Sequence, residues 1–382
     1  MRTTVTTLRS ALLIGAAIAC VQSIPAMVTL APLTTFGSNG WLAPGSNSYV
    51  TTGNFERGLG WNPVTKTLVL PSRSGGNSVA IINGTTGAVV KTLNTTGVSG
   101  GTLAMMGAGV SNDGQIFVSN HQSGSNAQSP YKIYKWSSEN DTAAPTTAFS
   151  QVLPATTTGG WRFGDAFAVY GSGTSLQFAA AGATTGTSNS LNNNGSFMVG
   201  KLDGSNTNTI YRAIPDTLTA SNDYRLSLTF VDDDTIIGNQ GGSAKLTDFV
   251  PAMTLSNTGA TITAVISLSA ADRPVDYTLL NGQALLATVN TNSSLISIYD
   301  ITDPAAATLL VTGSTVSGSL TGNANGTGGI RWGEALSPTS QVLYAMSTNQ
   351  GIQAMVFQAV PELTSLAFSI VAGGLLLTRR KR

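Results

Sequence analysis

The sequence predicts an all-β fold, a single β-propeller of six four-stranded blades. Three observations support this prediction. A strand–turn–strand pattern recurs along the body roughly every 50 residues, which is the spacing of propeller blades. An arginine stands near the start of the first strand in most copies of the pattern. Short apolar runs bounded by Gly, Asn and Asp fill the rest of each copy, as expected of strands and their turns.

The composition is that of an exported β-protein. Charged residues make up 10% of the 382 residues, well below the usual quarter or so. The net charge of +1 gives no electrostatic support for a nucleic-acid partner. The one cysteine is Cys20, in the leader, so the mature body has no disulfide, thiol chemistry or cysteine-bound zinc.

The chain begins with a predicted secretory signal over residues 1–26. Two arginines precede an apolar run at 11–19, and small residues follow it. Cleavage is expected after Ala26 or Ala19. The alternative is a lipoprotein, which would carry its lipid on Cys20.

The predicted propeller spans residues 27–358. Each unit opens with a hairpin whose turn holds residues suited to tight turns, such as Asn281-Gly282. Unit by unit, the predicted strands are 58–61, 67–70, 78–82 and 88–93; 108–110, 115–119, 131–136 and 146–152; 163–170, 175–180, 197–202 and 209–212; 226–231, 235–238, 244–248 and 262–268; 275–280, 284–289, 295–299 and 308–312; 330–336, 342–346 and 351–357.

The last unit lacks a fourth strand, while a spare apolar run at 28–36 precedes the first unit. We expect this spare strand to complete the last blade and close the ring, because closure removes exposed sheet edges. Seven blades stay possible if the segment 181–262 holds another hairpin. A stacked β-solenoid would have shorter repeats.

A short motif repeats at the first strand of two units. Arg331-Trp332-Gly333-Glu334-Ala335-Leu336 echoes Arg162-Phe163-Gly164-Asp165-Ala166-Phe167, and looser copies begin at other arginines. Radial repetition would gather these strand starts around one mouth of a central channel. The candidate ligand-binding residues at this mouth are Arg57, Arg162, Asp165, Arg225, Arg273, Asp276, Arg331, Glu334 and Trp161.

Two interpretations of this arginine ring stay open. Arginines and nearby acids, with Glu56 among them, could form ion pairs that hold neighbouring blades together. Alternatively, the mouth binds an acidic sugar or a carboxylated peptide. Core packing is expected for at least two of the tryptophans Trp61, Trp136, Trp161 and Trp332, and Trp161 beside Arg162 is the best candidate for stacking on a sugar.

No metal or cofactor site is predicted. Asp232-Asp233-Asp234 lacks the alternating ligand spacing of a calcium loop and is interpreted as a polar hairpin turn. His121 is the only histidine and is expected in a loop, after a strand that ends near Asn120. No serine has the Gly-x-Ser-x-Gly surroundings of a nucleophile elbow. Paired carboxylates for glycoside hydrolysis stay possible, because their separation is a matter of three-dimensional structure.

The C-terminal segment 359–382 has three parts. Pro361 and Glu362 precede an apolar run at 366–377, and the chain ends in Arg379-Arg380-Lys381-Arg382. This order resembles the bacterial PEP-CTERM sorting signal, except that Leu363 stands where that family has a second proline. The resemblance implies an exosortase-type membrane enzyme as partner, which would remove the tail after transient membrane anchoring. A simple C-terminal anchor is the alternative, and its basic end would place the body outside the cell.

The body also resembles an uncharacterised family of propeller-like domains in exported bacterial proteins. The resemblance covers most of the body and implies no activity. Its motifs are Glu56-Arg57-Gly58-Leu59, Asn62-Pro63, the segment 93–102, Tyr131-Lys132-Ile133-Tyr134-Lys135-Trp136 and Arg162-Phe163-Gly164-Asp165.

The sequence therefore predicts an exported propeller of the cell surface or extracellular matrix. It is expected to be non-catalytic and to bind a polysaccharide or a surface protein. The alternative is a propeller hydrolase or lyase, lactonase-like or glycan-active, with its site in the central channel. That site would take carboxylates from Glu56, Asp165, Asp276 or Glu334.

Overall fold

The computed structural model describes residues 28–124, 129–152, 161–184, 197–202, 210–213, 224–249 and 260–359. Within these ranges the chain is all-β, with short 3₁₀ turns and no α-helix, so no described helix could cross a membrane. The predicted signal peptide and the tail with Pro361 and Glu362 lie outside the described residues, as do the side chains of Trp161 and Arg162.

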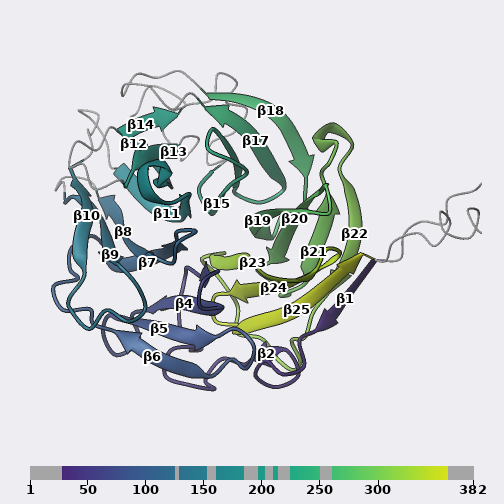
Figure 1. Cartoon of the computed structure of the whole chain (residues 1–382), viewed down its shortest axis with the longest axis horizontal. Helices are drawn as coiled ribbons and strands as arrows, with labels where there is room; N and C mark the ends of the chain where they lie inside the picture. Colours follow the sequence, from purple (N-terminus) through teal and green to yellow (C-terminus); the bar gives the residue numbers. More distant parts are fainter. Residues whose placement is uncertain are drawn as a thin grey trace, which may run out of the picture. The chain divides into compact units, whose positions relative to one another are not determined.

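The described strands form antiparallel sheets, labelled in Figure 1. One four-stranded sheet contains β3 (Gly60–Asn62), β4 (Thr67–Ser72), β5 (Ser78–Asn83) and β6 (Val89–Leu93). A second contains β15 (Ser227–Phe230), β16 (Thr235–Asn239), β17 (Ser243–Phe249) and β18 (Ala260–Ser267). A third contains β19 (Asp272–Leu280), β20 (Gln283–Asn290), β21 (Ile296–Asp300) and β22 (Thr308–Gly313). These elements confirm the strand–turn–strand units expected at the same positions.

Two further units are joined into one eight-stranded sheet. The first unit is β7 (Leu103–Val110), β8 (Ile116–Gly124), β9 (Tyr131–Trp136) and β10 (Thr146–Gln151). The second is β11 (Trp161–Tyr170), β12 (Gln177–Thr184), β13 (Phe197–Lys201) and β14 (Ile210–Ala213). Strand β8 pairs with β9 only as far as Ser119, and its later residues pair with β11, with Gln122 opposite Phe163. A bulge in β7 between Leu103 and Gly107 separates the two regions of β8.

The last sheet combines both ends of the described chain. It contains β23 (Gly328–Ser337), β24 (Ser340–Ser347), β25 (Ile352–Ala359), β1 (Val28–Pro32) and β2 (Trp41–Leu42). Strand β1 pairs antiparallel with β25, with Val28 opposite Ala359. The predicted pairing of the N-terminal strand with the last strand is therefore confirmed, although β1 ends at Pro32 and the chain rejoins β25 at β2. Proline lacks a backbone donor and is tolerated at such an edge.

The first strands of successive units contact one another. Strand β3 contacts β7, β7 contacts β11, β11 contacts β15, β15 contacts β19, and β19 contacts β23. Strand β23 in turn contacts β3. Apolar clusters lie between neighbouring units. One joins Phe117 and Tyr131 to Phe163 and Phe178, and another joins Leu285 of the β19–β22 sheet to Trp332 and Phe357 of the last sheet. The architecture is thus propeller-like, with the first strands innermost and the apolar core between sheets.

Candidate functional site

Two cavities lie along the first strands of the units. The narrow cavity has a volume of about 30 Å³, and the wide cavity one of about 500 Å³. Along each strand the residues of the narrow cavity come first and those of the wide cavity follow. Lining residues of the narrow cavity include Arg57, Leu59, Ala108, Asp165, Ser227, Pro274, Ile330 and Arg331. Those of the wide cavity include Trp61, Val110, Asn112, Tyr170, Thr229, Phe230, Asp276, Tyr277, Leu279, Arg331 and Trp332.

Asp276 joins the β19 unit to the β23 unit. Its Oδ1 accepts a hydrogen bond from Thr229 Oγ1 at 2.7 Å and lies 3.8 Å from Arg331 Nη1. Its Oδ2 accepts from the backbone N–H of Trp332 at 2.8 Å. Burial raises the pKa of the Asp276 carboxyl, and the Arg331 charge together with these hydrogen bonds opposes that rise. Three neighbouring first strands, β15, β19 and β23, thus meet at one carboxylate.

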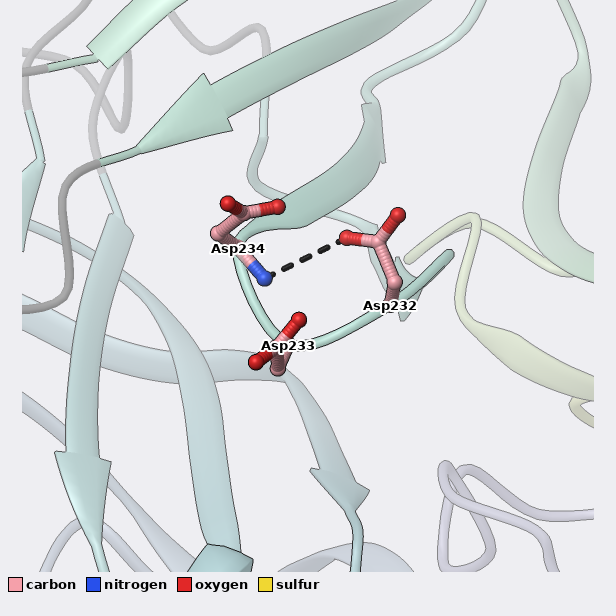
Figure 2. A group of neighbouring side chains, drawn as sticks. All are labelled: Asp232, Asp233 and Asp234. Carbon is pink, nitrogen blue, oxygen red and sulfur yellow. Dashed lines mark hydrogen bonds between the residues drawn. The ribbon is translucent and has the colours of Figure 1, made fainter.

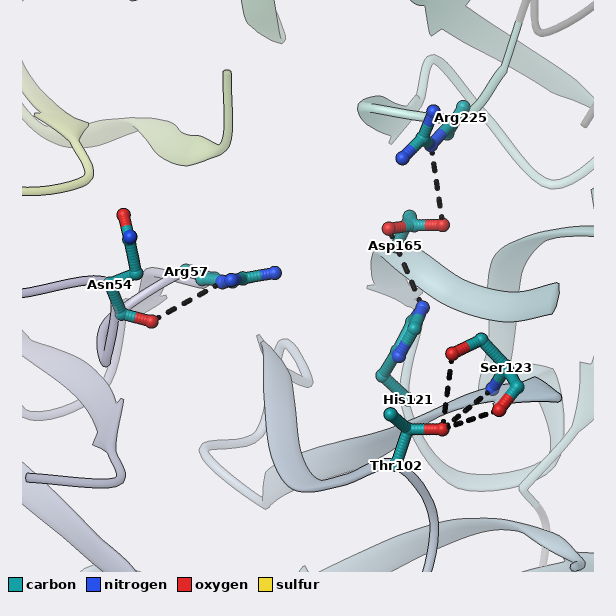
Figure 3. Close-up of polar contacts among 7 residues, drawn as sticks. All are labelled: Asn54, Arg57, Thr102, His121, Ser123, Asp165 and Arg225. Atoms are coloured by element: carbon teal, nitrogen blue, oxygen red, sulfur yellow. Dashed lines mark hydrogen bonds and ion pairs between the residues drawn. The ribbon is translucent and has the colours of Figure 1, made fainter. Parts of the chain in front are cut away.

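Asp165 of β11, at the narrow cavity, also contacts an arginine of the following unit (Figure 3). Its Oδ2 lies 3.5 Å from Arg225 Nε, just before β15, and its Oδ1 lies 3.5 Å from His121 Nε2. The side chains of Asp165 and His121 are 1% and 3% exposed. The loop position expected for His121 is therefore wrong, because β8 continues to Gly124 and its polar end is covered by β11.

Gly164 sets the direction of Asp165. Its φ is +86°, in the region that favours glycine, and the register of β11 with β12 shifts between Phe163 and Phe167. A Cβ on Gly164 would lie 2.5 Å from the Asn120 carbonyl oxygen and 2.7 Å from the Tyr131 ring. The glycine of the Arg-Phe-Gly-Asp motif therefore forms a bulge beside β8 and presents the acid to its partners.

The other acids near the arginines have different partners. Glu56 is buried and accepts hydrogen bonds from Ser72 Oγ at 2.6 Å and Thr51 Oγ1 at 2.9 Å. Burial raises the pKa of the Glu56 carboxyl, and these hydrogen bonds oppose that rise. Glu334 is ion-paired with Lys66. Asp165 and Asp276, in contrast, contact arginines of the following unit, which is the kind of pair between neighbouring blades that the structural interpretation of the arginine ring expects.

The remaining arginines of the expected ring lie at different positions. Arg57 Nε donates to the Asn54 carbonyl at 3.4 Å, and Arg57 lines the narrow cavity with Arg331. Arg273 lies against the backbone of the loops at Gly241 and Gly326 rather than along either cavity lining. Of the candidate residues, the structure thus brings Arg57, Asp165 and Arg331 to one cavity.

The aromatic lining of the wide cavity was not predicted from the sequence. Trp61, Tyr170, Phe230 and Tyr277 come from four different first strands and all line this cavity. Trp61 stacks on Tyr344 with ring centroids 5.2 Å apart, and Tyr170 stacks on Phe230 at 5.4 Å. An available signal was the aromatic residue that recurs near the end of the first strand, shortly before its turn.

The three aspartates of the β15–β16 turn gather their carboxylates (Figure 2). One oxygen from each of Asp232, Asp233 and Asp234 lies within 4.8 Å of the others, and Asp232 Oδ1 accepts from the Asp234 N–H at 3.2 Å. The pKa of Asp234 is raised, first by its side-chain hydrogen bond with Asp232 and then by burial and by the charge of Asp232. The turn adjoins Val231 of the wide cavity and contributes negative charge there.

Comparison with known proteins supports the fold. The family described as "Domain of unknown function (DUF4623)" matches residues 29–201. A solved DUF4623 family protein from Bacteroides eggerthii is 16% identical, with a TM-score of 0.62 over 89% of this chain and 78% of that chain. At this identity the likeness shows the fold alone. No curated protein matches the sequence.

Two other solved structures are more distant. A nidogen/laminin complex gives a TM-score of 0.40 at 12% identity, covering 69% of this chain and 80% of that chain. BamB from Moraxella catarrhalis gives a TM-score of 0.38 at 12% identity, covering 86% of this chain and 96% of that chain. The chain is an all-β, propeller-like protein, and the match to DUF4623 supports the resemblance of residues 29–201 to an uncharacterised family.

Proposed function

We propose that the chain is an exported, non-catalytic protein, a single six-bladed propeller closed by β1, that binds a glycan in the wide cavity. One observation carries this proposal. Half-buried aromatic side chains from separate first strands, Trp61, Tyr170 and Tyr277, surround a hollow of about 500 Å³. That volume is within the usual range of small-ligand sites. Aromatic faces offer apolar area to sugar C–H groups, while the phenol groups offer hydrogen bonds.

The two arginine–aspartate pairs support a structural role for the arginine ring. Each links a first strand to the arginine of the next unit, and both acids are largely buried. Removing one member of a buried pair leaves an uncompensated charge, so these pairs hold neighbouring units in place. In this proposal the narrow cavity, with room for about one water, is not the principal ligand site.

A propeller hydrolase or lyase is the second candidate, and Asp276 is the residue that favours it. Its pKa is raised, and it lies in the wide cavity beside Arg331. Among the described residues that line this cavity, however, Asp276 is the one carboxylate. The second carboxylate that most glycoside hydrolases require is not supplied by that lining.

Tyr277→Ala tests the glycan site. A glycan array with the purified protein would first identify a ligand. Loss of the stacking surface is then expected to weaken binding about tenfold, or ~1.4 kcal/mol. Tyr299→Ala is a matched control, because Tyr277 and Tyr299 pack against the same apolar cluster and only Tyr277 lines the wide cavity. Titration calorimetry would measure both, and equal losses of affinity would contradict the proposal.

Export and sorting form the second part of the proposal. The leader, the low charge and the three-part tail support secretion, followed by removal of the tail at the membrane. Mass spectrometry of the cell-surface protein is expected to find a C-terminus upstream of Arg379. An intact chain ending in Arg382 would instead support a simple anchor.

A further inference from the structure

The charged residues around the wide cavity are unbalanced. Two turns place acids directly after lining residues: Asp113 follows Asn112, and the three aspartates at 232–234 follow Val231. Two ion pairs are balanced: Arg331 with Asp276, both of which line the cavity, and Lys66 with Glu334, which follows the lining residue Gly333. The charge of Lys135 acts on Asp113, so within the described residues of these turns the excess of negative charge comes chiefly from the three turn aspartates.

The acids lie close enough to act on the aromatic lining. The charges of Asp232 and Asp233 contribute to a raised pKa of the Tyr170 phenol, after burial, and Asp232 does the same for Tyr277. The negative field of the turn therefore extends to the aromatic rings that would stack on a ligand. In a cleft with low-dielectric walls, such a field favours cations over neutral groups of the same shape.

Resting on the proposed glycan function, we infer that the wide cavity prefers a polysaccharide bearing free amino groups, such as a polymer of glucosamine. The sugar rings would lie on Tyr170, Tyr277 and Trp61, which line the hollow. The protonated amines would lie toward the Asp232–Asp234 turn. The turn acts here as a source of field for an aromatic site, and no metal is needed to account for its charge.

The test compares two oligosaccharides that differ only at nitrogen. Calorimetry on the purified full chain would measure binding of the glucosamine tetramer and of the N-acetylglucosamine tetramer. The amine form is expected to bind about tenfold more tightly at low ionic strength. This preference should shrink as salt is added, because the turn is exposed and screened. Equal affinities would overturn the charge preference.

A pair of variants assigns the preference to the turn. Asp233→Asn removes one charge from an exposed side chain and should reduce the preference for the amine form about threefold. Asp303→Asn makes the same change on an exposed side chain between β21 and β22, the outer strands of the neighbouring sheet, and should leave the preference unchanged. Equal effects of the two variants would overturn the assignment.

Other outcomes separate the inference from the proposed function. If both tetramers bind equally and Tyr277→Ala weakens both, the glycan site stands and only the preference fails. If tetralysine binds more tightly than the glucosamine tetramer through Tyr277, the ligand is a basic peptide and the inference is overturned. If no glycan binds, both the function and the preference fail.

Discussion

Asp276→Ala is expected to lower the free energy of unfolding by about 3–5 kcal/mol, the cost of removing one partner from a buried ion pair. The carboxylate accepts from Thr229 Oγ1 and from the Trp332 N–H, and it faces Arg331. Alanine would leave these donors unsatisfied at the junction of three first strands. Urea denaturation of the purified protein, followed by tryptophan fluorescence, would measure the loss.

The double variant Asp276→Ala/Arg331→Ala provides the control. It removes both charges, so part of the stability lost in Asp276→Ala should return. Asp248→Ala should change stability little, because Asp248 is exposed and accepts one long hydrogen bond from Thr235. A loss of less than ~1 kcal/mol for Asp276→Ala would show that the carboxylate does not hold the units together.

The raised pKa of Asp276 has a defined effect on the pH dependence of stability. Between the unfolded value of 3.8 and the higher folded value, the folded state binds more protons than the unfolded state. The contribution of Asp276 is therefore most favourable below pH 3.8 and falls as the pH rises through the folded pKa. Asparagine at this position does not titrate. The difference in unfolding free energy between the native protein and Asp276→Asn, measured by urea denaturation at several pH values, should therefore fall as the pH rises from 3.8 through the folded pKa.

Much of the fold could be predicted because its units are local. Alternating apolar residues and turn residues such as Asn281-Gly282 fix each hairpin within about ten positions, and the structure has strands there. The pairing of β1 with β25 could also be predicted, because a missing strand and a spare strand complement each other. This pairing follows from the number of strands and the need to cover exposed sheet edges, so it can be predicted without side-chain contacts.

The charge partners could not be predicted, because they depend on contacts between units. The Asp165 carboxylate contacts His121 on β8 and Arg225 just before β15, both of them far from Asp165 in the sequence. His121 follows an apolar run and resembles a loop residue in sequence. It is buried because β11 pairs with the end of β8, a contact that no local pattern encodes.

Gly164→Ala is expected to have the second large effect on stability, because the φ of +86° at Gly164 is unfavourable for any residue with a Cβ. An alanine Cβ would also lie 2.5 Å from the Asn120 carbonyl oxygen and 2.7 Å from the Tyr131 ring, so the bulge or β8 would have to move. Backbone strain and overpacking together should lower the free energy of unfolding by about 3–5 kcal/mol.

Gly242→Ala separates these two contributions. Gly242 has a φ of +83°, and a Cβ there would have no atom within 4 Å, so it carries the strain without the clash. Its loss should be limited to about 1–2 kcal/mol. The difference between the two variants, measured by urea denaturation, is the cost of crowding the bulge against β8. Equal losses would mean that β8 yields at little cost. A larger loss of unfolding free energy for Gly164→Ala would show that the glycine is required where β11 joins the β7–β10 unit. Asp165 contacts Arg225 and His121 from this same place.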